Sequence, residues 1–237
     1  MLQVKNNSPF MPHLTVLPDK DGIDTLLITV KGTFALGEKV TVHPKQVPVV
    51  PADQHYDDPN TTSIKVPSDV SLPKPAADLL LLGHAYAPGG EATSCEVSLR
   101  LGTGVKTIRA VGNRTWVGGL LGMKASPPQA FDKIPLTWER AFGGRDVHPK
   151  NPEKKAAEER NPAGRGFYHF SAPIEGTLLP NLEPVAKAYR GYRDRVDPAC
   201  FAPLAGGWQP RGAVEGSTPC KLLVTFNKYG NLPLYLL

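Results

Sequence analysis

Apolar residues alternate with polar ones in two segments close to the N-terminus, residues 13–17 and 25–36. A period of two is the pattern of a β-strand, because successive side chains of a strand point to opposite faces of the sheet. The segment between them, residues 18–22, has the sequence Pro-Asp-Lys-Asp-Gly and is typical of a turn. The pattern therefore predicts a β-hairpin. Valines continue it over residues 40–50, where prolines restrict the chain to an edge strand or an extended arm.

The strongest strand signal follows a polar connection. Residues 53–75 are polar and rich in proline, which predicts a long connection over the surface. Residues 77–87 contain four consecutive leucines, and the short length of this run favours a strand buried on both faces over a helix. Residues 97–101, 105–111 and 115–117 come next, and the glycine-containing turns between them predict a meander of three strands.

Strand periodicity fades after residue 118 and returns near the C-terminus. Residues 152–160 begin with a proline and pair lysines with glutamates, which predicts a short helix that Asn-Pro then ends. Residues 183–190 are a second short helical segment by their composition. Residues 221–226 and 232–237 are two further predicted strands around a polar turn.

These patterns predict a mainly β fold, an antiparallel β-sandwich-like scaffold with long Pro/Gly-rich loops and one or two short helices. The chain has 237 residues, of which 41% are hydrophobic, enough for a sizeable core. Its 25 Pro and 23 Gly agree with a fold rich in turns. Since we find no internal repeat and no break in composition, we expect a single domain over residues 1–237.

The segment 134–144 predicts a corner of the chain that is anchored by aromatic side chains. Trp138 and Phe142 are four residues apart and would share one face of a helical turn. Glu139 and Arg140 are neighbours that cannot face each other on a helix, so each should find a separate partner. We expect Arg140 to be paired, bidentate and at least half buried.

Glycines mark the places where the chain must change direction. Gly143, Gly144, Gly164 and Gly166 lie at such places, and we predict a positive φ for at least two of them. We hypothesise a structural role for these glycines and for further residues: Trp116, Trp138, Glu139, Arg140, Phe142, Gly143, Gly144, Asn161, Gly164, Gly166, Trp208 and Arg211.

Charge and cysteine content limit the class of protein only loosely. The formal net charge of +5 is spread along the chain, so it permits anionic partners without identifying one. The three cysteines are far apart and form no C-x-x-C pair, which argues against a disulfide framework and favours a reducing cytoplasm. The N-terminus has no apolar signal-peptide region, and no run of 18 apolar residues occurs, so we expect neither secretion by a signal peptide nor a membrane span.

The motifs of catalysis and cofactor binding are missing from the sequence. Gly102 and Gly104 lack the third glycine of a dinucleotide fingerprint, and no Gly-x-Ser-x-Gly elbow occurs. The six histidines show no spacing typical of a metal site. We therefore expect no catalytic residues, no cofactor and no metal, while a hydrolase with an unrecognised site stays open as an alternative.

Two segments combine arginine with aromatic residues, 165–170 and 189–195. Such a composition suits a nucleic-acid-binding module, because arginines can contact phosphates while rings stack on bases. The favoured interpretation is that the arginines tie long loops to a β scaffold. The segment 165–170 begins like an RNA-recognition submotif but has a tyrosine where a small residue is needed, so nucleic acid is the less favoured partner. The predicted protein-binding residues are Phe167, Tyr168, Tyr189, Arg190, Tyr192 and Arg193.

Several motifs occur together and in order along residues 31–211. They are Asp78 with Gly83-His-Ala-Tyr-Ala-Pro88, Lys106, Val111-Gly-Asn-Arg-Thr-Trp116, Pro135-Leu136 with Glu139-Arg-Ala-Phe-Gly-Gly144, Asn161-Pro-Ala-Gly-Arg-Gly-Phe167, Leu179-Pro-Asn-Leu-Glu183 and Trp208-Gln-Pro-Arg211. With these motifs the chain resembles a bacterial family of uncharacterised domains, domain of unknown function family 2169, which is associated with type VI secretion genes. Residues 213–237 depart from that family's usual continuation, so we expect an atypical or truncated C-terminus.

The resemblance implies a non-enzymatic adaptor or chaperone that acts in the bacterial cytoplasm. Its expected partners are a secretion effector and a spike (VgrG-type) or spike-tip (PAAR-type) protein, with no cofactor and no membrane. The nucleic-acid-binding module and the hydrolase are the two alternatives that the residues leave open.

Overall fold

The computed structural model describes residues 3–19, 21–35, 38–70, 78–101, 104–119, 122–203, 205, 208, 221–225 and 233–236. The chain divides into two compact units whose segments alternate along the sequence. Unit 1 comprises Met1–Tyr56, Ile64–Leu82 and Gly212–Leu237, and unit 2 comprises Asp57–Ser63 and Gly83–Arg211. The single domain over residues 1–237 stays a prediction.

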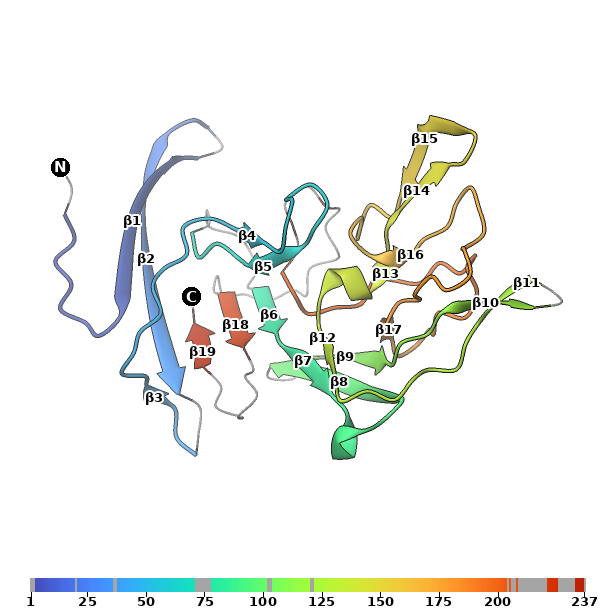
Figure 1. The fold of residues 1–237 in the computed structure, drawn as a ribbon. Coiled ribbons are helices and arrows are strands. Elements are labelled where there is room, and N and C mark those ends of the chain that lie inside the picture. Colours follow the sequence, from blue (N-terminus) through green and yellow to red (C-terminus); the bar gives the residue numbers. More distant parts are fainter. Residues whose placement is uncertain are drawn as a thin grey trace. The chain divides into compact units, whose positions relative to one another are not determined.

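The main sheet of unit 1 joins the N-terminal and C-terminal parts of the chain (Figure 1). The predicted hairpin is confirmed, since β1 and β2 pair antiparallel from Met11 opposite Lys31 to Pro18 opposite Asp24. The two predicted C-terminal strands also form and pair with each other. The strands run in the order β1 (Met11–Pro18), β2 (Asp24–Ala35), β19 (Pro233–Leu236), β18 (Lys221–Thr225) and β6 (Asp78–Leu82), with β3 (Thr41–Val42) paired to β2.

Part of the predicted surface connection is buried. Within residues 53–75, β4 (Gln54–His55) and β5 (Ile64–Val66) pair as a short hairpin of unit 1. Ile64 and Asp69 are buried there. The prediction of a connection over the surface is therefore wrong for part of the segment, because Asp69 forms an ion pair with the buried Lys31.

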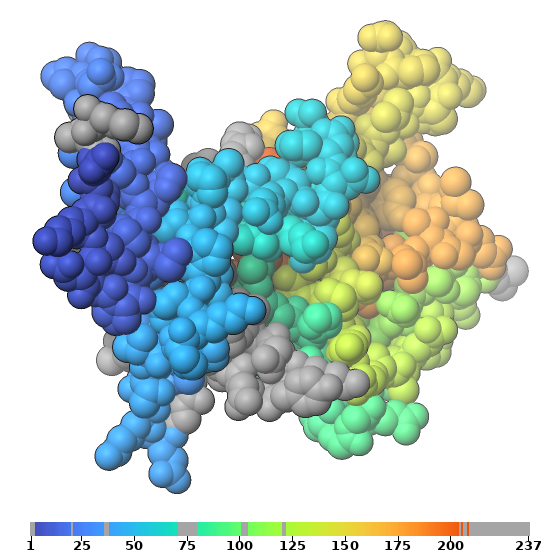
Figure 2. Space-filling model, turned by 60° about the vertical axis from the view of Figure 1, so that its left-hand side comes forward, coloured from blue at the N-terminus to red at the C-terminus, as the bar shows by residue number. Residues whose placement is uncertain are grey.

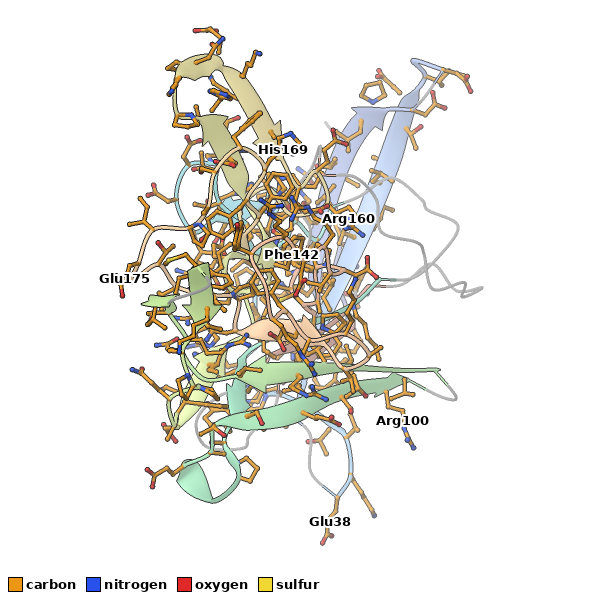
Figure 3. All side chains as sticks on the ribbon, turned by 90° about the vertical axis from the view of Figure 1, so that its right-hand side faces the viewer. Glu38, Arg100, Phe142, Arg160, His169 and Glu175 are labelled. Carbon is orange, nitrogen blue, oxygen red and sulfur yellow. The ribbon has the colours of Figure 1, made fainter. Side chains whose placement is uncertain are left out.

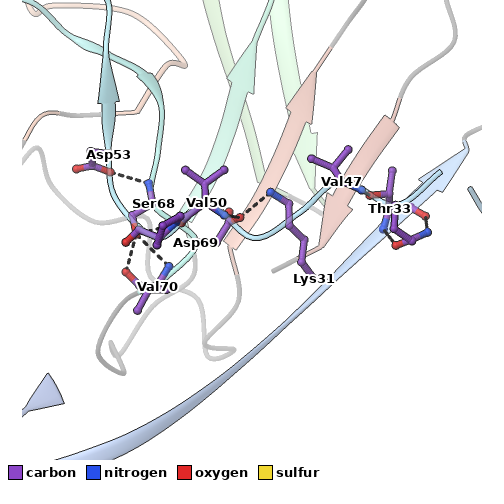
Figure 4. A network of polar contacts seen from close by, with 10 residues as sticks. Lys31, Thr33, Val47, Val50, Asp53, Ser68, Asp69 and Val70 are labelled. Carbon is purple, nitrogen blue, oxygen red and sulfur yellow. Dashed lines mark hydrogen bonds and ion pairs between the residues drawn. The ribbon is translucent and has the colours of Figure 1, made fainter. Parts of the chain in front are cut away.

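A buried ion pair joins this segment to strand β2 (Figure 4). The Lys31 ammonium lies 2.6 Å from the Asp69 carboxylate, and both side chains are almost fully buried. The same carboxylate accepts a hydrogen bond from the backbone N–H of Val50 at 2.8 Å. The segment around Asp69 is thus tied to β2 by charge and by backbone hydrogen bonds.

Unit 2 consists of short strand pairs connected by long loops. The three-stranded sheet places β9 (Gly104–Val111) between β8 (Ser94–Leu101) and β17 (Leu182–Pro184). The remaining pairs are β7 (His84–Tyr86) with β12 (Lys133–Pro135), β10 (Trp116–Gly119) with β11 (Gly122–Ala125), β13 (Phe142–Gly143) with β16 (Arg165–Gly166), and β14 (Arg145–His148) with β15 (Asn151–Ala157). Two short 3-10 turns, η1 (Pro88–Gly90) and η2 (Trp138–Arg140), complete the unit.

The prediction of a mainly β fold is confirmed, with several antiparallel sheets that agree with a sandwich-like scaffold. In the described part of the chain, no helix is long and apolar enough to cross a membrane.

Neither predicted helix forms where the composition suggested it. Residues 151–157 form strand β15 instead, because all of them except Ala156 are exposed and a helix there would have no apolar face to bury. Residues 183–190 begin in strand β17 and continue through a turn, because the buried Glu183 accepts hydrogen bonds from Arg114 and from the backbone of Tyr189.

The leucine-rich strand has other bounds than predicted, and the third strand of the meander has another partner. The leucine-rich strand ends at Leu82, and a bend at Gly83 separates β6 of unit 1 from β7 of unit 2. The first two strands of the predicted meander, β8 and β9, pair as expected, whereas β10 pairs with β11 and the other edge of β9 pairs with β17. That edge of β9 is thus occupied by residues 182–184, which are distant in the sequence. The spacing of neighbouring strands along the chain does not predict this pairing.

Removing Lys31 should destabilise the protein strongly, because Asp69 would remain buried without its cation. We expect Lys31→Ala to lower the free energy of unfolding by about 3–5 kcal/mol, the usual cost of breaking a buried ion pair. Chemical denaturation followed by tryptophan fluorescence or circular dichroism would measure it. Lys45→Ala, at an exposed lysine of the same unit, is the control, and equal effects of the two substitutions would contradict the prediction.

Candidate functional site

The corner at residues 134–144 is anchored by two charged side chains with separate partners, as predicted for Glu139 and Arg140. The Glu139 carboxylate accepts hydrogen bonds from the backbone N–H and the hydroxyl of Ser63, at 2.8 and 2.9 Å. The Arg140 guanidinium donates through Nη1 to Oδ1 of Asn181 at 3.1 Å. Arg140 is partly buried, and this single hydrogen bond to a distant side-chain amide stands in place of the bidentate contact that was expected.

Arg165 comes from a distant motif and reinforces the same corner. Its Nε donates to the backbone oxygen of Glu139 at 2.9 Å. Burial lowers the pKa of Arg165 to about 10, and the neighbouring charge of Arg140 adds to this effect. Burial also lowers the pKa of Arg140. Two partly buried arginines therefore lie around Glu139, where they hold loops together.

Asn161 lies at the centre of the contact between the corner and the segment 161–166. Its side chain is completely buried, and Nδ2 donates to the backbone oxygens of Trp138 and Phe142 at 2.8 and 2.9 Å. The backbone oxygen of Asn161 accepts hydrogen bonds from Gly144 and Gly164. The Asn161 side-chain amide thus links the backbone of the corner to the segment 161–166.

The glycine prediction is confirmed. Gly143, Gly144 and Gly166 have φ values of 151°, 111° and 93°. Gly164 does not have a positive φ, but a Cβ atom there would lie 2.7 Å from the backbone oxygen of Ala141. A Cβ at Gly143 would lie 2.1 Å from the backbone oxygen of Asn161. The two segments approach so closely that side chains do not fit between them.

Trp138 and Phe142 are both buried, although they do not share a helical turn. The turn η2 ends at Arg140, and Phe142 begins strand β13. The Trp138 indole donates to the backbone oxygens of Ala202 and Pro203. Phe142 instead packs in a core cluster with Trp116, Leu179, Tyr189 and Val196 (Figure 3 labels Phe142).

The remaining two residues of the structural set are Trp208 and Arg211. Trp208 is partly buried, and its backbone N–H donates to Ala205 at 3.4 Å. Arg211 lies outside the described residues.

The two arginine and aromatic segments, which are far apart in the sequence, come together around one open pocket of about 520 Å³. The pocket has walls from residues 168–172 and 192–195. A hydrogen bond of 2.7 Å from Nη2 of Arg195 to the backbone oxygen of Tyr168 joins the two segments. Six side chains supply its rings and charges: Tyr168, His169, Phe170, Tyr192, Arg193 and Arg195.

The structure separates the predicted protein-binding residues into surface and core. Arg190 and Arg193 are exposed, while Phe167, Tyr168 and Tyr192 are partly buried around the pocket. Tyr189 is completely buried, and its hydroxyl donates to the backbone oxygen of Gly166 at 2.6 Å. Tyr189 therefore supports the pocket from the core.

Buried tyrosines and an ion pair hold the pocket loops in place. Burial raises the pKa of Tyr168 and, more strongly, that of Tyr189, so both phenols stay neutral near pH 7. The Trp116 ring makes edge contacts with Tyr168, Tyr189 and Tyr192, at centroid distances of 6.1–6.4 Å. The Arg114 guanidinium pairs with the buried Glu183 carboxylate, and both side chains bond to the backbone of Tyr189.

One surface of unit 1 was missed by reasoning from the sequence. In the register of the β1–β2 hairpin, Pro12, Leu14 and Val16 lie opposite Val30, Ile28 and Leu26. Residues directly opposite each other in an antiparallel pair point to the same face. We call this face the apolar hairpin face. Its exposed fractions are 52% for Val16, 46% for Leu26, 63% for Ile28 and 49% for Val30.

The signal for this face was present in the sequence. Apolar residues at every second position of both strands predict one apolar face. Such a face is normally covered by the core, and the sequence contains nothing to say that it would remain exposed. In the space-filling view, the hairpin is blue and lies at the surface (Figure 2).

A family model described as "Uncharacterized protein conserved in bacteria (DUF2169)" matches residues 21–224. The chain belongs to the DUF2169 family. None of the curated proteins and none of the solved structures compared with the chain matches it.

The DUF2169 match spans the corner, the Asn161 segment and both walls of the pocket. It also includes β2 but begins after β1. Within the described ranges of this DUF2169 chain, no group of three or more His, Cys, Asp or Glu side chains is placed to hold a metal ion.

Arg140→Ala should lower the stability of the protein, because Oδ1 of Asn181 would lose its donor. We expect the free energy of unfolding to fall by about 1 kcal/mol or more, measured by chemical denaturation. Arg100→Ala, at an exposed arginine of β8, is the control. A loss no larger than that of the control would show that Arg140 does not anchor the corner.

Gly143→Ala should destabilise the protein more than Gly176→Ala. Both glycines have a positive φ, but a Cβ at Gly176 meets no atom within 4 Å, whereas one at Gly143 meets the backbone of Asn161. The strain of φ is thus common to both substitutions, and only the first adds overpacking, which typically costs about 1–3 kcal/mol more. Melting temperatures of the two variants would measure the difference, and equal melting temperatures would rule out the close packing at Gly143.

Proposed function

We propose that the chain is a non-enzymatic adaptor or chaperone, which binds a type VI secretion effector and helps to load it onto the spike or its PAAR-type tip. Two considerations support the proposal. Membership of DUF2169 agrees with the motif resemblance on which the link to type VI secretion rests. The apolar hairpin face supplies a surface suited to holding another protein.

The apolar hairpin face is the observation that carries the proposal. Its six apolar side chains lie in register on two adjacent strands, and four of them are between 46% and 63% exposed. Exposed apolar patches of this kind mark surfaces for protein–protein contact, because covering them removes apolar area from water. A chaperone needs such a surface to shield apolar parts of its cargo.

The proposed partners are the effector on one side and a spike (VgrG-type) or spike-tip (PAAR-type) protein on the other. Loading would take place in the bacterial cytoplasm, before secretion. Binding would be stoichiometric, and a stable complex of this kind buries about 1,200–2,000 Å² in total. The effector must therefore contact more of the chain than the hairpin face alone.

Co-expression with the effector encoded beside this gene tests the proposal. We expect the wild-type chain and the effector to elute together in gel filtration, and we expect Ile28→Glu to reduce the recovered complex at least tenfold, because a charge would be buried in the interface. Val105→Glu is the matched control. Like Ile28, Val105 is an exposed β-branched residue of a strand, 56% exposed, but it lies on β9. Both variants should melt within about 2 °C of the wild type, because the substituted side chains are largely exposed.

The second candidate function is nucleic-acid binding, which the arginines and rings of the pocket favour. If the purified protein bound neither the effector nor a spike protein, yet held oligonucleotides that only high salt removes, the adaptor proposal would be wrong. Steep dependence of that binding on salt would identify phosphate contacts.

A further inference from the structure

Two arginines contribute positive charge to the pocket between residues 168–172 and 192–195. Arg193 and Arg195 belong to its lining, and the described lining includes neither Asp nor Glu. Asp194 lies between these arginines in the sequence, but its Oδ2 accepts the backbone N–H groups of Arg190 and Gly191 at 2.9 and 2.8 Å. This carboxylate therefore closes its own turn, and it keeps its negative charge beside the two arginines.

A second carboxylate is used in the same way on the other wall. Oδ2 of Asp146 accepts the backbone N–H groups of His169 and Phe170, both at 2.7 Å. Burial opposes the charge of Asp146, but backbone hydrogen bonds outweigh it and lower the pKa of this carboxyl. Asp146 is therefore ionised at neutral pH and fixes the loop that carries the rings.

The two arginines of the pocket differ in the contacts that they make within the protein. Arg195 donates to the backbone oxygens of Tyr168 and Asp194, and its guanidinium lies 4.8 Å from the centre of the Phe167 ring. Arg193 is exposed, lies 5.6 Å from the centre of the Tyr192 ring, and forms no ion pair within the described part of the chain. Arg195 thus holds the pocket together, and Arg193 is available to a ligand.

Aromatic rings supply the apolar part of the pocket. Tyr168 and Tyr192 make an edge contact with each other, at a centroid distance of 6.4 Å, and Phe170 lies on the same wall as Tyr168. A ring that is packed in this way loses little conformational entropy when a ligand covers it. The pocket volume of about 520 Å³ lies in the range of sites that hold a compact ligand.

We propose that this pocket binds an acidic segment of a second protein, in which a carboxylate pairs with Arg193 and a neighbouring apolar or aromatic side chain packs on Tyr168 and Tyr192. An arginine at a ring face suits a carboxylate well, because its planar guanidinium can donate two parallel hydrogen bonds. A polynucleotide is less well matched, since its affinity comes from many successive phosphate contacts and one arginine of this pocket, Arg193, is available to a ligand. The proposal is independent of the apolar hairpin face, which lies in unit 1.

Fluorescence anisotropy with the purified full chain and three labelled probes tests the site. The first probe is a twelve-residue peptide of alternating glutamate and aromatic residues, the second replaces every glutamate by glutamine, and the third is a twelve-nucleotide single-stranded DNA. We expect the glutamate peptide to bind at least tenfold more tightly than the glutamine peptide, and more tightly than the DNA. We expect Arg193→Glu to weaken binding of the glutamate peptide at least tenfold.

Arg100→Glu is the matched control for the change of net charge. Arg100 is exposed at the end of β8, apart from His169 of the pocket (Figure 3), so its reversal should alter the affinity less than twofold. Arg193→Glu should melt at the same temperature as the wild type, because its side chain is exposed. Equal affinity for the two peptides, equal effects of the two charge reversals, or tighter binding of the DNA would each overturn the proposal.

Discussion

The close approach of residues 141–144 to residues 161–166 is the constraint on which unit 2 depends. At Gly143 and Gly164 the backbones leave no room for a Cβ atom. Asn161 uses this proximity, because its amide reaches the backbone oxygens of Trp138 and Phe142 only when the two segments are in contact. The parallel pairing of β13 with β16 follows directly. It leads into residues 167–170, so one side of the pocket is positioned by a packing contact with the core.

The other side of the pocket is held in place by the buried ion pair of Glu183 with Arg114. Glu183 is buried with Arg114, which also donates to the backbone oxygens of Pro180 and Tyr189. These contacts fix the start of the segment that carries Tyr192 and Arg193. Glu139, Asp146 and Asp194 are likewise bound by N–H or O–H donors of loops. These carboxylates hold the loops of the unit in place, and the Arg193 side chain stays exposed at the pocket.

Unit 1 exposes its apolar side chains through the geometry of its sheet. In the described part of the chain, strand β19 pairs with β2 along residues 32–35, whereas β1 pairs with β2 along residues 24–31. The hairpin thus extends past the region in which β19, β18 and β6 continue the sheet, and one of its faces remains apolar and uncovered. The adaptor proposal uses this face for cargo, and the acidic-segment proposal uses the pocket of unit 2. The two surfaces differ in chemistry, so each can be tested without disturbing the other.

The sequence by itself determined the mainly β fold, the β1–β2 and β8–β9 hairpins, the C-terminal strand pair and a positive φ for at least two of the four glycines at residues 143, 144, 164 and 166. These features follow from side-chain period and glycine geometry, which act between neighbouring residues. Only the tertiary structure decided that residues 151–157 form a strand, that β9 pairs with β17 and that Tyr189 is buried. Each of these outcomes depends on contacts between residues distant in the sequence or on which face of an element is covered, and neither is encoded in local periodicity.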